Sequence, residues 1–96
     1  MSGPKAPSAF LSIGEVAQRL NVPIHVIRFW EARIGELRPL RSARGQRRYR
    51  PEDVHLLMGI RHLLDVEART IRGVQRTLRD HGIDHVRSVG RESVAA

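Results

Sequence analysis

Cysteine is missing altogether from the 96 residues, which excludes both disulfide bonds and thiolate-bound metal. Long hydrophobic runs are missing too, because no stretch approaches the roughly 20 apolar residues that a bilayer-spanning helix needs. The N-terminus carries no signal-peptide pattern. We therefore expect a single domain in the reducing cytoplasm, with no membrane among its partners.

The residue patterns of common enzymes are absent as well. No glycine-rich phosphate loop occurs, and no serine, histidine and aspartate stand at spacings that argue for a catalytic triad. Glu15, Glu31 and Glu36 have no evident partner group for acid–base chemistry. His81 and His85 have a helical i, i+4 spacing, but a glycine lies between them. The sequence therefore predicts no enzymatic activity, no cofactor and no metal site.

Acidic residues are scarce where basic ones gather. The net charge is +7 with a pI of about 11.5, and residues 41–50 contain five arginines and no Asp or Glu. Such charge attracts nucleic acid or an anionic membrane, although a charge run is often only a solvated face. Clustered arginines repel one another, and an unliganded loop gains nothing from that cost. We therefore favour phosphate binding.

The segment after residue 10 predicts two helices joined by a tight turn. Ser12 and Glu15 have the S-x-x-E spacing of a capping box, which starts a helix. The apolar face of this helix has helical spacing and comprises Ile13, Val16, Ala17 and Leu20. Asn21 tolerates the left-handed geometry that ends a helix, and Pro23 suits the first turn of the next. This arrangement is typical of a helix-turn-helix.

The second predicted helix, residues 23–33, has an inward and an outward side. Ile27 and Trp30 continue the inward face, and core packing is the favoured interpretation of Trp30. His25, Arg28 and Phe29 are left on the outer side, where a recognition helix meets base edges and phosphates. Core packing of Phe29 and a merely solvated His25 remain alternatives.

A hairpin is predicted next. Residues 37–40 and 46–49 have the character of short strands around a turn at 42–45, and Pro39 confines the first strand to an edge. We expect Leu37 and Leu40 to anchor this hairpin while the arginines project outward.

Two further helices follow. Pro51 and two carboxylates open the third helix, and Thr70 and Gly82 bound the fourth. Gly90 and small residues make 83–96 weak as a helix, so we expect a weakly structured tail, with a frayed helix or a crossover contact as alternatives. The predicted fold is mainly α, a winged helix-turn-helix of four helices with a two-stranded hairpin wing. A disordered arm (1–10), the winged domain (11–82) and the tail (83–96) divide the chain.

Residues 11–82 resemble the DNA-binding domain of the MerR family of bacterial transcriptional regulators. The resemblance lies in SIGEVAQRLNVPIHVIRFWEARIG, RGQRRYRPEDVHLL and TIRGVQRTLRDHG. The family usually has an arginine, two aromatics and an acid in its second helix, matched by residues 28–31. Its wing usually has Arg-x-Tyr before an acidic helix start, matched by residues 47–49. The resemblance implies that Arg28 and Phe29 touch DNA and that Arg47 and Tyr49 serve the wing. Gln46 departs from the pattern, because the family often has an aromatic there.

Typical members of this family continue into a long coiled-coil helix that forms a dimer. No long heptad segment follows Gly82 here. We therefore keep two modes of assembly on DNA open, a homodimer through another contact and single domains in tandem. By the same resemblance, RNA polymerase is a possible partner.

The predicted function is sequence-specific binding of double-stranded DNA in the bacterial nucleoid, by a transcriptional regulator or its DNA-binding part. Helix 23–33 would enter the major groove and the wing, residues 41–50, would lie on the backbone. An excisionase-like DNA-bending protein and a basic protein-interaction module are the alternatives. The predicted DNA-binding residues are Ser12, Pro23, Ile24, His25, Arg28, Phe29, Arg41, Arg44, Arg47, Arg48, Tyr49 and Arg50.

Overall fold

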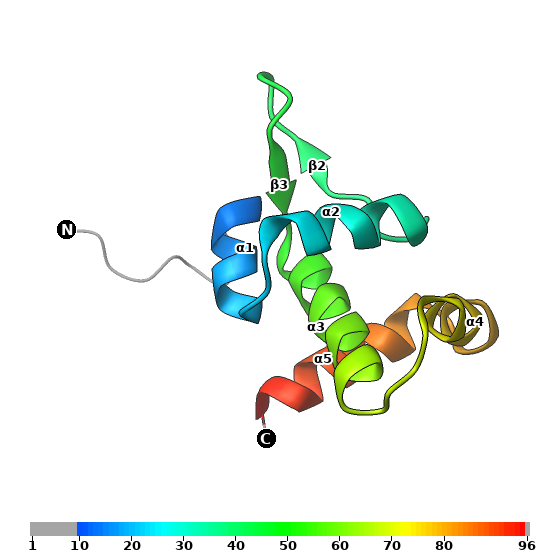
Figure 1. Ribbon diagram of the computed structural model, residues 1–96. Coiled ribbons are helices and arrows are strands. Elements are labelled where there is room, and N and C mark those ends of the chain that lie inside the picture. Colours follow the sequence, from blue (N-terminus) through cyan, green and yellow to red (C-terminus); the bar gives the residue numbers. More distant parts are fainter. Residues whose placement is uncertain (1–9, 96) are drawn as a thin grey trace.

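A computed structural model describes residues 10–95, and Figure 1 shows its helices and strands. The predicted arm, residues 1–10, lies outside the described residues except for Phe10. In chain order the elements are β1 (Leu11–Ser12), α1 (Ile13–Leu20), α2 (Ile24–Arg33), β2 (Leu40–Arg41), β3 (Arg47–Tyr49), α3 (Pro51–Asp65), α4 (Ile71–His81) and α5 (Ile83–Ala95). The predicted winged helix-turn-helix is confirmed, and it carries one more helix and one more strand than the sequence indicated.

The helix-turn-helix forms as its local signals predict. The Ser12 hydroxyl accepts the Glu15 N–H at 3.2 Å, and the Glu15 carboxylate accepts the Ser12 N–H at 2.9 Å. Asn21 ends α1 in the left-handed region with φ 57°, and its N–H bonds back to the Ala17 and Gln18 carbonyls. Ala17 is buried, so α1 and α2 can approach closely.

The wing belongs to a three-stranded antiparallel sheet in the order β1-β3-β2. Two features of the predicted hairpin are wrong. β2 begins at Leu40 rather than at residue 37, because Pro39 has no N–H to donate to a ladder. Leu40 is 40% exposed and does not anchor the hairpin, whereas Leu37 is buried. Leu11 of β1 pairs with Tyr49 instead, and both side chains are buried.

The core lies around α3, which most other elements contact. Its buried apolar side chains are Val54, Leu56, Leu57, Met58, Ile60 and Leu63. Pro51 occupies the first helical turn, and Thr70 and Gly82 bound α4 as predicted. Val74 and Leu78 of α4 complete this side of the core. No helix among the described residues is long and apolar enough to cross a bilayer.

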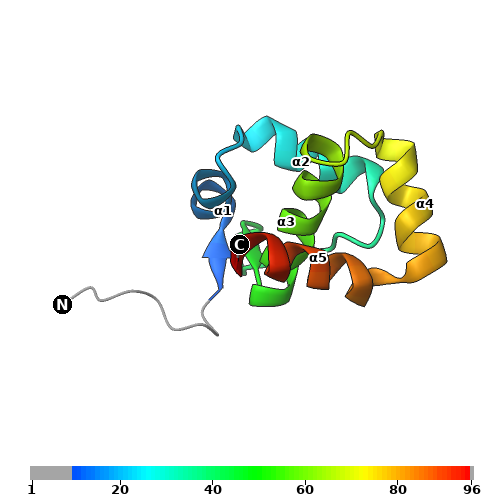
Figure 2. The same cartoon turned by 90° about the horizontal axis from the view of Figure 1, so that it is seen from below.

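The predicted weakly structured tail is wrong, because residues 83–95 form helix α5. Figure 2 shows α5 running beneath α3, with α1 and α4 on opposite sides. The two helices cross at Gly59 and Gly90, where a Cβ on Gly90 would collide with the His55 carbonyl and lie 2.8 Å from the Gly59 nitrogen. Val86 is fully buried beside them. Close backbone approach through glycine therefore stabilises a helix that its own sequence disfavours.

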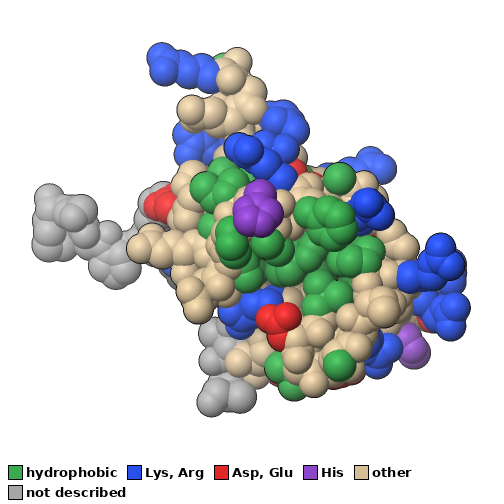
Figure 3. Space-filling view, in the orientation of Figure 1, with side chains coloured by type: hydrophobic (Ala, Val, Ile, Leu, Met, Phe, Trp, Pro, Cys, Tyr) green, Lys and Arg blue, Asp and Glu red, His purple; other side chains and the backbone are tan. Residues whose placement is uncertain are grey.

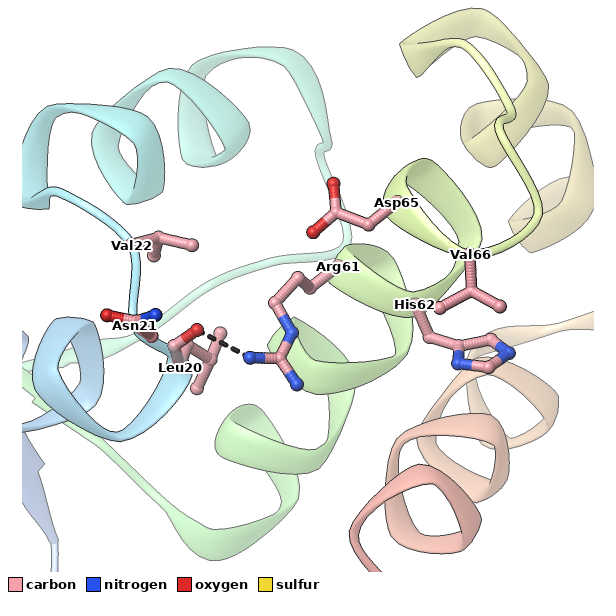
Figure 4. A pocket seen from close by; sticks show the side chains of 7 residues that line it. All are labelled: Leu20, Asn21, Val22, Arg61, His62, Asp65 and Val66. Carbon is pink, nitrogen blue, oxygen red and sulfur yellow. Dashed lines mark hydrogen bonds between the residues drawn. The ribbon is translucent and has the colours of Figure 1, made fainter. Parts of the chain in front are cut away.

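Arg61 of α3 fixes the turn of the helix-turn-helix. Its Nη1 donates to the Leu20 carbonyl at 2.5 Å, across a pocket of about 250 Å³ between that turn and the end of α3 (Figure 4). The last carbonyls of a helix lack partners within the helix and carry partial negative charge. The guanidinium satisfies one of them, so α3 helps to hold α1 and α2 in their mutual orientation.

Candidate nucleic-acid interface

The outer side of α2 presents two rows of side chains. Ile24 and Arg28 stand four residues apart in one row, and His25, Phe29 and Arg33 form the other. All five are exposed, whereas Ile27 and Trp30 are buried as predicted. The core alternative for Phe29 is therefore wrong, since its side chain is 44% exposed. Pro23, also exposed, occupies the N-cap position just before the helix and makes no side-chain capping bond.

Phe29 and Arg33 form a fixed pair. The Arg33 guanidinium carbon lies 4.8 Å from the centroid of the Phe29 ring, within cation–π range. The Arg33 carbonyl accepts the Gln75 side chain from α4 at 2.5 Å. This row therefore lies on the α4 side of α2, and its aromatic ring has a defined position.

Glu31 joins α2 to the wing. Its carboxylate accepts from Arg47 Nε at 2.6 Å and from the Tyr49 hydroxyl. The Glu31 side chain is only 10% exposed, so these charge-assisted bonds are shielded from water. The hydrogen bond to Glu31 raises the pKa of Arg47, and burial followed by the same carboxylate raises the pKa of Tyr49. Arg28 stands three residues before Glu31, which places its row on the wing side of α2.

Tyr49 is fully buried, and its hydroxyl is bound to Glu31. The structure corrects the predicted DNA contact by this residue, because a side chain without exposed surface cannot touch a ligand. Tyr49 instead holds β3 of the wing against α2.

Arg50 is also held internally. Its guanidinium binds the buried Asp53 through two bonds of 2.9 and 3.0 Å and donates to the Arg38 carbonyl at 3.3 Å. The bond to Asp53 raises the pKa of Arg50. The expectation that the wing arginines all project outward is therefore wrong for Arg47 and Arg50, because carboxylates from α2 and α3 recruit them.

The tip of the wing is a turn built on Ser42. Its hydroxyl accepts the N–H groups of Arg44 and Gln46, and its backbone pairs with Gln46 and Gly45. Gly45 has φ +79°, a conformation that glycine adopts without strain. Arg41 donates to the Gly45 carbonyl at 3.1 Å. Arg44 is exposed at this tip, and its guanidinium has no partner within residues 10–95.

Arg48 lies on the other face of the sheet from Arg47 and Tyr49, because neighbouring side chains along a strand alternate. Its cross-strand partners are Ser12 and Leu40. The Ser12 hydroxyl already caps α1, so only its proton is available to a ligand. Arg48 and Ser12 are thus separated from the α2 face by the thickness of the sheet.

One face of the molecule collects most of these groups. In the orientation of Figure 1, the hairpin rises beside α2, and Figure 3 shows arginine side chains over the hairpin and beside α2 and α4. Hydrophobic side chains fill the middle of the same face. The exposed apolar residues on α2 and at the end of α3 are Ile24, Phe29 and Val66. A cationic border around an apolar centre suits a grooved polyanion.

A family model described as "MerR HTH family regulatory protein" matches residues 11–81 of the chain. The chain belongs to this MerR family. No curated protein and no solved structure is significantly similar to it. The match extends from β1 to the end of α4, so the helix-turn-helix, the wing and the central helix all lie within the MerR domain. As a MerR HTH domain, the chain is a DNA-binding regulatory module.

The MerR motifs acquire a physical reason in this geometry. The acid of the α2 motif is Glu31, and the arginine and tyrosine of the wing motif are Arg47 and Tyr49, which bind it. The sequence alone does not show the partners of Glu31, because they lie 16 and 18 residues away in another motif. The sequence does carry a signal for this contact. An acid stands on the inward side of α2, and a basic strand that could pair with it follows 16 residues later.

Arg33 was also missed, although its i, i+4 spacing from Phe29 predicts a contact on a helix surface. His81 and His85 come close across Gly82, with ring centroids 5.2 Å apart. Within the described residues, no group of three or more His, Asp or Glu side chains is placed to hold a metal ion.

Proposed function

We propose that this MerR domain binds specific sequences in double-stranded DNA, with α2 in the major groove and the wing on the adjacent backbone. The observation that carries the proposal is the Glu31–Arg47–Tyr49 cluster. It fixes the wing beside α2, so Arg28 and the wing tip can address one strip of duplex.

The available cations divide into two roles. Arg28 and His25 are exposed on α2 and can reach base edges, where arginine pairs bidentately with guanine. Arg41 and Arg44 lie in the wing and meet phosphates. Arg47, Arg48 and Arg50 remain in the proposed set as secondary phosphate contacts, because two are paired internally and one lies on the outer face of the sheet.

Alanine variants test this division. A site is first selected from a random pool of duplexes, and affinity is then measured across a salt series. Arg28→Ala is expected to weaken the selected site by about tenfold or more while changing random DNA much less. Arg44→Ala is expected to weaken both alike and to lower the salt slope by about 0.9.

Arg91→Ala is the matched control, because Arg91 is an exposed arginine of α5, a helix that Figure 2 shows on the other side of α3 from α2. It removes the same charge and is expected to have little effect on either duplex. Equal effects from all three variants would show that only net charge matters. Unchanged affinity in all three would refute the interface.

We also propose that binding regulates transcription by RNA polymerase. Transcription from a promoter that carries the selected site separates this from DNA bending alone. A bound promoter whose output never changes would favour the architectural alternative.

A further inference from the structure

We propose that α2 recognises thymine through its 5-methyl groups, using the exposed side chains of Phe29 and Ile24. The inference rests on the proposed DNA binding and names the bases that this surface reads. It begins with what the exposed side of α2 offers chemically.

Hydrogen-bonding groups are few on that side. Helix α2 contains no Asn, Gln, Ser or Thr, and its one acid, Glu31, is occupied by Arg47 and Tyr49. Asn and Gln, the usual bidentate partners of adenine, are therefore missing from α2. No acid is available to accept a hydrogen bond from cytosine. Arg28 and His25 remain, which is enough for one or two base pairs.

Apolar surface is abundant by comparison. Ile24 is 38% and Phe29 44% exposed, and Figure 3 shows hydrophobic side chains continuing between α2 and α4. The Arg33 guanidinium carbon lies 4.8 Å from the centroid of the Phe29 ring, so a cation adjoins the apolar surface. Exposed apolar surface bordered by polar groups marks an interaction site.

The border decides which partner fits. Two exposed cations border this surface, because Arg28 follows Ile24 by one helical turn and Arg33 lies against the Phe29 ring. An apolar protein partner would have to bury their charges, whereas DNA supplies phosphates to them. The thymine 5-methyl is the apolar group that the major groove displays, and phenylalanine is among the side chains that contact it. The preferred site should thus place thymines beside a guanine read by Arg28.

The test removes the methyl rather than the side chain. Each thymine of the selected duplex is replaced in turn by deoxyuridine, which keeps every hydrogen bond and lacks only that methyl. For the unaltered protein, at least one replacement is expected to weaken binding about three- to fivefold, the loss from withdrawing one methyl from an apolar contact.

Variants then assign the methyl to a residue. Phe29→Ala is expected to bind thymine and uracil duplexes alike at the sensitive position, whereas Phe29→Leu keeps part of the difference. Phe10→Ala is the matched control, because Phe10 is 46% exposed and lies outside α2. It is expected to retain the full sensitivity of the unaltered protein.

The outcomes separate this inference from the function beneath it. Tight binding of the selected duplex with no uracil effect above twofold overturns methyl recognition and leaves DNA binding intact. Methyl recognition is also overturned if Phe29→Ala weakens both duplexes by the same factor, so that the preference for thymine over uracil remains. The ring would then contribute only to the fold. Failure to bind any duplex overturns both.

Discussion

Glu31 is the residue on which the relative placement of α2 and the wing depends. Its partners, Arg47 and Tyr49, stand 16 and 18 residues later in the chain. A carboxylate shielded from water is satisfied when two donors bind it. Removing one donor leaves a polar group without a hydrogen bond and lowers the free energy of unfolding by about 1–3 kcal/mol. Tyr49 contributes both a hydrogen bond and a buried ring, which makes it a probe of this cluster.

We predict that Tyr49 makes the fold sensitive to alkali. Burial raises the pKa of Tyr49 far above its ordinary value near 10. Above about pH 10 the unfolded chain loses the phenolic proton while the folded chain keeps it. The unfolded state then binds fewer protons, so stability is fully present below that pH and falls above it, by about 1.4 kcal/mol per pH unit. Equilibrium unfolding across an alkaline series measures this slope.

The chain contains a single tyrosine, so any tyrosinate absorbance that appears at alkaline pH comes from this group alone. Tyrosinate absorbance should appear together with unfolding. Tyr49→Phe is the control, expected to lose about 1 kcal/mol at neutral pH and to flatten the alkaline slope. Tyrosinate formed in the folded protein near pH 10 would contradict the prediction.

Exposure of individual side chains was largely predictable, and their pairing was not. Helical spacing placed His25, Arg28 and Phe29 outward and Trp30 inward. Spacing alone does not predict that Arg47 and Tyr49 turn inward, because periodicity gives no information on which residue lies opposite a strand. That depends on the register of β3 against β1 and on the position of α2.

At the scale of elements, local signals predicted the helices that carry them. Capping at Ser12 and Thr70 and proline at residue 51 fixed the starts of α1, α4 and α3. β1 has two residues, too few to show alternation, and forms only because β3 lies beside it. The sequence predicts α5 only as an alternative to a weakly structured tail, because Gly90 lowers its helix propensity. Its close crossing with α3 supplies the compensation.

We predict that this crossing is intolerant of a single methyl group. In Gly90→Ala the added carbon would collide with the His55 carbonyl, and in Gly59→Ala it would collide with the Val86 carbonyl and lie 2.8 Å from Val86 Cγ1. Backbone must shift in both, so each should lower the free energy of unfolding by about 1–3 kcal/mol. Chemical denaturation measures the change.

Gly14→Ala is the matched control for these variants. Gly14 also lies in a helix, but the atom nearest to an added Cβ is 3.9 Å away. The same substitution should there be neutral or stabilising by up to about 1 kcal/mol. Equal stability of all three variants would mean that α5 does not pack closely on α3.

At the scale of the whole molecule, the proposed DNA-binding helix α2 and helix α5 lie on different sides of α3. The wing rises at one end in Figure 1, and α5 crosses the middle of α3 through Gly59 and Gly90. Val86 of α5 is buried against the domain, while the exposed residues between 83 and 93 are Asp84, His85, Arg91 and Glu92. Among the described residues, α5 therefore presents a polar outer side rather than the apolar seam that a coiled coil requires.

We predict, from this polar side, that the chain is a monomer in solution and that two copies bind DNA in tandem. A two-fold dimer needs one surface patch that is complementary to itself, whereas copies arranged head to tail do not need such a patch. Sedimentation at micromolar concentration should give the mass of one chain. A footprint on the selected site should show direct repeats about 10 base pairs apart, since each α2 must reach the same face of the helix. A dimer without DNA, or an inverted repeat, would refute tandem binding and require a two-fold interface elsewhere on the domain.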